Sequence, residues 1–190
     1  MINLNEKAQE IFAQNKAAGW WDDINRCIYQ TIQLINTEIA EATEGARKDL
    51  MDDHLPHRKM EEVELADVLI RTLDLGGRCG WVLNNDYLSD KAIDGAASQI
   101  TRAGHSAGRQ HLGMCSLVCE LSKSLIPGDE YDCKNPETDG YYTMLCLVVL
   151  SYGLSCGYDI ITAMEEKIEY NKQRADHKRD NRNKDGGKKF

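Results

Sequence analysis

Apolar residues recur at steps of three and four positions along most of the chain, with polar residues between them. This spacing matches the 3.6-residue turn of an α-helix, because residues three and four apart share one face. The pattern therefore predicts an all-α fold, a helical bundle. The helices that we expect cover residues 5–17, 24–46, 56–79, 89–103, 109–125, 141–156 and 159 onward.

The second expected helix carries a carboxylate within its apolar stripe. Asp22 or Asp23 is suited to cap the start of this helix. The stripe comprises Ile24, Ile28, Thr31, Ile35, Glu38 and Ala42. An ionised Glu38 on a buried face requires a compensating charge, which is either a core Lys or Arg or a metal ion. A second carboxylate pair downstream favours the metal ion.

The third expected helix has a broad apolar side and a narrow polar strip opposite it. Taken alone, such a strip is typical of a solvent-exposed face. Apolar residues flank it on both sides, however, which indicates burial. The strip consists of Glu64, Asp67, Arg71 and Asp74, and the flanking residues are Met60, Val68 and Leu75.

These two helices each hold a pair of carboxylates three residues apart, and 22 residues separate the pairs. Two residues at this spacing project from adjacent turns, so two antiparallel helices can aim four carboxylates at one small volume. The like charges repel, and a divalent cation relieves the repulsion. Carboxylate oxygens suit Mg²⁺, Mn²⁺ or Ca²⁺ better than zinc. The predicted metal ligands are Glu38, Glu41, Glu64 and Asp67.

Two segments lack a helical period and read as loops. Residues 47–59 are polar, and Pro56 fits the first turn of the following helix, where Glu61 and Glu62 would lie near the positive helix end. Arg47, Lys48, His54 and Arg58 either close over a substrate or belong to a solvated loop. Residues 129–139 form the second loop, with Pro136 and Gly140 as breakers.

Composition and charge limit the function classes. Apolar residues make up 42 % and charged residues 28 % of 190 residues, as in a folded helical domain. The net charge is −8, and residues 1–164 carry −11, which argues against nucleic acid as a partner. The longest apolar run has seven residues, too short to cross a membrane.

The seven cysteines show no regular spacing, which favours a reduced state and a cytoplasmic location. His111, Cys115 and Cys119 share a helix face and could bind a soft metal, but buried cysteines are more often part of a core. A faint repeat pairs residues 75–81 with residues 152–158 at an offset of 77. The offset places no carboxylates opposite the two acidic pairs, so the second copy would be degenerate.

At the two acidic pairs the chain resembles the all-α nucleoside triphosphate pyrophosphohydrolases, the MazG-like superfamily. That superfamily includes dimeric dUTPases, dCTP pyrophosphatases and phosphoribosyl-ATP pyrophosphohydrolases. Its motif is E-x-x-E, a gap, then E-x-x-D, which matches Glu38 to Glu41 and Glu64 to Asp67. Many relatives end in K-x-x-x-N-x-x-R and a Gly-Lys-rich tail, which resembles Lys167, Asn171 and Arg174, then His177 and residues 186–189. Here about 75 residues intervene between the second carboxylate helix and this terminal segment, where relatives usually have a short connection.

The resemblance implies a Mg²⁺-dependent enzyme, with Mn²⁺ as a possible substitute, that cleaves a (d)NTP to a (d)NMP and pyrophosphate. It implies that Lys167, Asn171 and Arg174 contact phosphate or sugar; otherwise they belong to an exposed helix end. We expect one domain over residues 1–180, with the metal site in 1–97 and a degenerate half plus the phosphate-contacting helix in 98–180. Residues 181–190 would be a flexible basic tail. A homodimer or larger homo-oligomer is expected.

Two rival interpretations remain. A carboxylate-bridged di-iron bundle would use Glu-x-x-His pairs, and the chain has none. A non-enzymatic helical interaction protein would carry acidic strips as solvent faces or partner surfaces.

Overall fold

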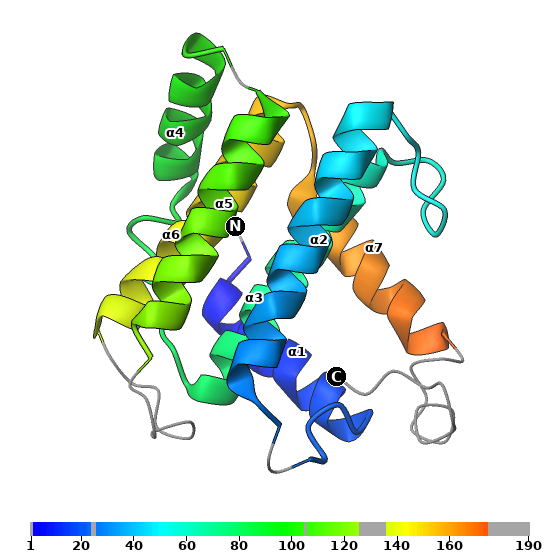
Figure 1. Ribbon diagram of the computed structural model, residues 1–190, viewed down its shortest axis with the longest axis vertical. Coiled ribbons are helices and arrows are strands. Elements are labelled where there is room, and N and C mark those ends of the chain that lie inside the picture. Colours follow the sequence, from blue (N-terminus) through cyan, green and yellow to red (C-terminus); the bar gives the residue numbers. More distant parts are fainter. Residues whose placement is uncertain (1, 24–25, 105, 126–135, 175–190) are drawn as a thin grey trace.

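The computed structural model describes residues 2–23, 26–104, 106–125 and 136–174, and every regular element in these ranges is a helix (Figure 1). The only paired extended residues described are Met51 and Lys59, in an isolated bridge. The prediction of an all-α fold is therefore confirmed. The helices are α1 (Leu4–Ala17), α2 (Ile28–Lys48), α3 (Met60–Cys79), α4 (Asp90–Arg102), α5 (Ala107–Lys123), α6 (Pro136–Ser155) and α7 (Ile160–Gln173).

Four helices form a closed ring in which α2 packs on α3, α3 on α6, α6 on α5 and α5 on α2. The other three lie outside this ring: α1 packs on α3, α4 on α6, and α7 mainly on α3. Helix α3 thus touches α1, α2, α6 and α7, which explains why its polar residues are buried as well as its apolar ones. Its close approach to α6 depends on Gly76, where a Cβ would lie 2.3 Å from the Tyr142 ring.

The two parts of the chain are arranged alike, since α1 and α2 pack on α3 as α4 and α5 pack on α6. Helix α3 ends at Gly80 with φ 68°, and the turn after α6 contains Gly157 with φ 79°. In both places a following aromatic residue donates its backbone N–H to a glycine carbonyl five residues earlier, Trp81 to Gly76 and Tyr158 to Gly153. The similar sequences at these positions therefore encode the same turn. The internal repeat itself stays a prediction.

Three expected helix boundaries are wrong. Helix α2 is capped at Cys27 and not at Asp22 or Asp23. Arg26 donates to the Trp20 carbonyl and lies over the Trp21 ring, and these contacts hold the preceding segment in a turn. The expected stripe is buried from Ile28 onward, while Ile24 lies outside the described residues.

The other two boundaries concern prolines. Pro56 precedes α3, because the bridge between Met51 and Lys59 keeps residues 56–59 in the loop. Pro136 begins α6, five residues before the expected start, and Glu137 and Asp139 occupy the first turn, where the helix dipole favours acids. Residues 126–128 and the expected tail at 181–190 lie outside the described residues. Among the residues described, no single helix is long and apolar enough to span a membrane. Helices α6 and α7 reach the required length and hydropathy only when taken together, and the two are bent by 108° relative to each other.

Candidate functional site

Three of the four predicted ligands lie together where α2 packs on α3. Glu38 and Glu41 come from α2 and Glu64 from α3, and one carboxylate oxygen of each lies within 4.8 Å of the others. Glu38 and Glu64 are buried, with exposed fractions of 8 % and 6 %, whereas Glu41 is exposed. The site thus has two fixed carboxylates and one that solvent reaches.

Asp67, the fourth predicted ligand, lies one turn along α3 and is bound by a lysine. Lys167 of α7 places its Nζ 2.8 Å from Asp67 Oδ2, and this lysine is only 2 % exposed. On the other side of the cluster, Arg71 Nε lies 3.0 Å from Glu38 Oε1. The protein therefore supplies two counter-charges of its own to a group of four carboxylates.

Burial, together with the remaining excess of negative charge, raises the pKa values of the two buried carboxylates. Burial raises the pKa of Glu64 to about 9, with Asp67 adding to the rise and Lys167 opposing it. Burial also raises the pKa of Glu38, although Arg71 opposes this, and the charges on Asp67 and Glu41 add to it. Ionising all the carboxylates at once is thus unfavourable, and a divalent cation bound among their oxygens would offset that cost.

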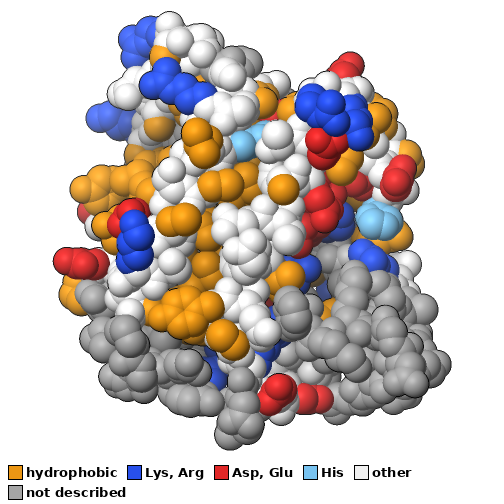
Figure 2. Space-filling model, in the orientation of Figure 1, with side chains coloured by type: hydrophobic (Ala, Val, Ile, Leu, Met, Phe, Trp, Pro, Cys, Tyr) orange, Lys and Arg blue, Asp and Glu red, His pale blue; other side chains and the backbone are white. Residues whose placement is uncertain are grey.

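A cavity of about 750 Å³ opens beside the carboxylates, between α1, α2, α3 and α7. Its lining includes all four carboxylates and the three residues assigned to substrate by the resemblance, Lys167, Asn171 and Arg174. The Asn171 Oδ1 atom is buried and has no hydrogen-bond partner among the described residues. Figure 2 shows acidic side chains beside basic ones along the strip between α2 and α7. The Lys167, Asn171 and Arg174 segment and the two acidic pairs therefore line the same cavity.

The cavity lining also includes polar and aromatic residues outside the predicted ligand and substrate sets, among them Trp20, Arg26, His54 and Arg71. Arg71 belongs to the polar strip of α3, so the sequence already contained a signal for it. His54 was one of several candidates in a polar loop. Trp20 and Arg26 follow the α1 helix in a turn without periodicity, and no pattern marked them.

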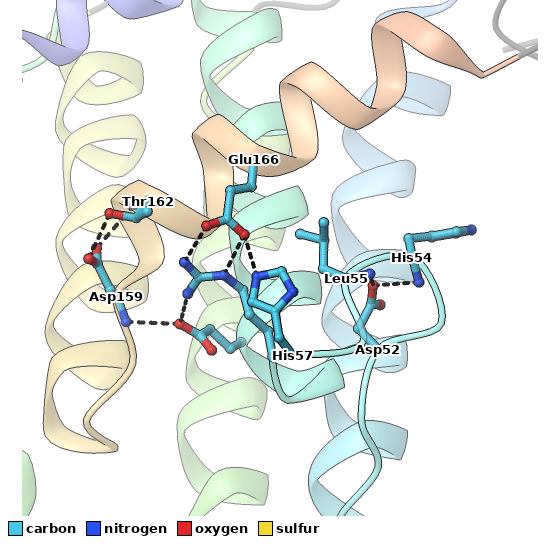
Figure 3. A network of polar contacts seen from close by, with 9 residues as sticks. Asp52, His54, Leu55, His57, Asp159, Thr162 and Glu166 are labelled. Carbon is cyan, nitrogen blue, oxygen red and sulfur yellow. Dashed lines mark hydrogen bonds and ion pairs between the residues drawn. The ribbon is translucent and has the colours of Figure 1, made fainter.

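Helix α7 is held over the cavity by the loop between α2 and α3 (Figure 3). Arg58 of this loop binds Glu166 of α7 through two hydrogen bonds of 2.9 Å and also binds Glu62 of α3 at 2.6 Å. His57 contacts the same Glu166 at 2.8 Å. Because Lys167 follows Glu166 directly, this network fixes where the lysine enters the cavity.

The same loop also positions His54. The Asp52 carboxylate accepts the backbone N–H groups of His54 and Leu55 at 2.9 and 2.7 Å, which fixes the turn (Figure 3). The His54 ring then packs on Tyr170 of α7, with ring centroids 4.8 Å apart. Of the loop residues considered from the sequence, His54 lines the cavity and Arg58 supports it, while Arg47 and Lys48 pair with Glu44 at the surface.

We expect the network around Glu166 to weaken in acid. Hydrogen bonds from Arg58 lower the pKa of Glu166 to about 2, from its ordinary value of 4.5. Because the folded pKa is the lower one, the stabilisation is complete above pH 4.5 and is lost as the pH falls toward 2. In the Glu166→Gln variant the melting temperature should therefore fall less steeply between pH 4.5 and pH 2 than in the wild type. Melting curves followed by circular dichroism from pH 2 to 6 measure this difference. An unchanged slope would show that the network does not govern the acid response.

A second buried polar cluster lies at one end of the four-helix ring, away from the cavity. Tyr152 and Tyr158 donate to the two oxygens of Glu61 at 2.7 and 2.8 Å. His111 Nδ1 lies 2.9 Å from the Thr43 hydroxyl, and its Nε2 lies 3.3 Å from Glu61 without the alignment of a hydrogen bond. Since His111 is engaged here, the suggested soft-metal group with Cys115 and Cys119 has no support.

Comparison with models of protein families, with curated proteins and with solved structures found no match to this chain.

Proposed function

We propose that the protein is a Mg²⁺-dependent nucleoside triphosphate pyrophosphohydrolase that cleaves a (d)NTP between the α- and β-phosphates. The observation that carries the proposal is the shared cavity, in which a cluster of carboxylates faces Lys167, Asn171 and Arg174. Oxygen-only ligands at such spacing suit Mg²⁺ or Mn²⁺, and the cationic side chains in the same cavity suit a polyphosphate. The resemblance to the MazG-like superfamily supports the same reading.

In this proposal Glu38, Glu41, Glu64 and Asp67 would hold a divalent cation, which when bound would neutralise phosphate charge and increase the acidity of water. Glu41, the exposed member of the cluster, orients a water molecule and accepts its proton. The water oxygen attacks the α-phosphorus, the bond from that phosphorus to the bridging oxygen breaks, and pyrophosphate leaves. Lys167 and Arg174 bind the phosphate oxygens, and the Asn171 side chain binds phosphate or sugar.

The proposal is tested by product analysis. The protein is incubated with a panel of ribo- and deoxynucleoside triphosphates and Mg²⁺, and monophosphate and pyrophosphate are measured. Equal amounts of both products, lost when a chelator removes the metal, are expected. Diphosphate with orthophosphate would indicate cleavage at the wrong bond. No product from any nucleotide would favour the rival reading as a non-enzymatic interaction protein.

Thermal melting should report the metal directly. We expect Mg²⁺ at about 100 times its dissociation constant to stabilise the fold by about 2.7 kcal/mol and to raise the melting temperature by about 5 °C or more. Mn²⁺ should act likewise. Na⁺ at equal ionic strength controls for screening of the exposed acids. Equal curves with Mg²⁺ and Na⁺ would contradict a shared cation site.

Residence in the cytoplasm and assembly into a homodimer or larger homo-oligomer stay predictions. The ring of α2, α3, α6 and α5 supplies a four-helix core within one chain. Measuring the mass in solution by light scattering with Mg²⁺ present tests the expected oligomer.

A further inference from the structure

A buried acid that the proposed reaction does not use lies in the wall of the same cavity. Asp74 is on the polar strip of α3, seven residues beyond Asp67, and is 6 % exposed. Seven residues of helix advance about 10 Å. Asp74 thus lies about a nucleoside's length from the carboxylates that would hold the cation and the phosphates.

The contacts of Asp74 leave it able to accept further hydrogen bonds. Trp21 Nε1 donates to its Oδ1 at 3.1 Å, and the Asn15 side chain also donates to this carboxylate. No lysine, arginine or histidine among the described residues forms an ion pair with it within 4 Å. A carboxylate offers about four acceptor positions, and these two bonds occupy two of them.

The structure fixes Asp74 firmly. Trp21 packs edge-on against Phe12 with ring centroids 6.0 Å apart, and Arg26 lies over its ring at 4.4 Å. Burial raises the pKa of Asp74 to about 6, opposed by the bonds from Trp21 and Asn15, so the group is mainly ionised at pH 7.5. It therefore presents acceptors and no donor to the cavity.

The surroundings of Asp74 suit a flat ring with a polar edge. The cavity lining from α1 and the turn after it includes Ile11, Ala17, Ala18 and Trp20, which offer apolar and aromatic surface. A nucleobase with an amino group brings N–H donors to a carboxylate. A base with a carbonyl at the same position would set two acceptors against each other, which is unfavourable in a buried site.

We propose that Asp74 is a specificity-determining residue of this site, which accepts a hydrogen bond from the amino group of a nucleobase and selects amino-bearing nucleotides over their oxo counterparts. This inference rests on the proposed function, because it assigns the base to the cavity end opposite the phosphates. Adenine and cytosine carry the required group, and hypoxanthine and uracil are the matched oxo bases.

The wild-type protein provides the first test. The comparison uses purine nucleotides or pyrimidine nucleotides, whichever the protein hydrolyses faster. We expect kcat/KM for pyrophosphate release to favour ATP over ITP, or CTP over UTP, by at least about tenfold. A site built to bind an N–H group rejects an analogue without it, because its own acceptor is left unpaired. A smaller preference, or one for the oxo nucleotide, would overturn the role of Asp74.

A variant provides the second test. Asp74→Asn replaces one acceptor by a donor, so the preference should shrink by about tenfold while the oxo nucleotide is still hydrolysed. Asp90→Asn is the matched control, since Asp90 is exposed on α4 and outside the cavity. An unchanged preference in a folded Asp74→Asn protein would overturn the inference. If this variant does not fold, the kcat/KM ratio of the wild-type protein for amino and oxo nucleotides is the test of the inference.

Failure of the inference can be told apart from failure of the proposed function. Calorimetric binding of AMP, IMP, CMP and UMP with Mg²⁺ requires no turnover. Preferential binding of AMP or CMP without any pyrophosphate release would support base selection by Asp74 and contradict the proposed hydrolase activity. Pyrophosphate release with equal binding of amino and oxo bases would support the proposed hydrolase activity and contradict base selection by Asp74.

Discussion

Glu41→Gln is expected to lower pyrophosphate release by at least about 100-fold while leaving the melting temperature of the metal-free protein nearly unchanged. Glu41 is the exposed member of the carboxylate cluster, so replacing it removes the oxygen proposed to bind the metal and orient water, without creating a buried defect. Initial rates with saturating Mg²⁺ and a melting curve measure the two effects separately.

Glu44→Gln is the matched control for this prediction. Glu44 lies on the same helix, three residues further on, and binds Arg47 and Lys48 at the surface outside the cavity. We expect it to retain normal turnover. Full activity in Glu41→Gln, or an equal loss in both variants, would remove Glu41 from the proposed mechanism.

The second large effect concerns stability. Asp67→Asn should destabilise the protein by about 3 kcal/mol, because it leaves the charge of Lys167 buried without its partner. For a chain of this size the melting temperature would fall by about 10 °C. Lys167→Met should also destabilise the metal-free protein, since the carboxylate cluster then loses one of its two counter-charges.

The double variant Asp67→Asn with Lys167→Met separates the ion pair from its surroundings. We expect it to be more stable than either single variant, as found when both members of a buried pair are replaced. Denaturant unfolding of the four proteins completes the cycle. Mg²⁺ should stabilise Lys167→Met more than wild type, because the added cation replaces the missing charge. Additive single effects would show that the two side chains act independently.

The sequence predicts the helices of the site well and its counter-charges poorly. The stripe through Glu38 and the strip through Glu64 follow from helical periodicity, and the structure places their oxygens together. Residue spacing shows only which side chains share a helix face. It does not place Lys167 at the site, and only the resemblance to the superfamily assigned this lysine to the substrate. The pairing of Asp67 with Lys167 depends on how α7 packs on α3, and that of Glu38 with Arg71 on how α2 packs on α3.

Two helix starts differ from the sequence-based prediction because tertiary contacts override the local preference of the residues. Asp22 and Asp23 are good capping residues, but Arg26 and Trp21 hold their segment in a turn and α2 begins later. Pro56 suits a helix start, but the bridge between Met51 and Lys59 delays α3 to Met60. Asp74, Trp20 and His54 meet in one cavity although no spacing links them.

If the proposed cation binds, the salt bridges of Arg71 and Lys167 separate folding from metal binding. Proteins whose metal site holds bare, uncompensated ligands often unravel when the ion is stripped. Here two of the four acids, Glu38 and Asp67, already have internal partners, so the chain would reach its native shape without the proposed cation and would keep that shape when the cation leaves. Loading would then follow the supply of free magnesium in its surroundings, reversibly, for as long as the protein persists.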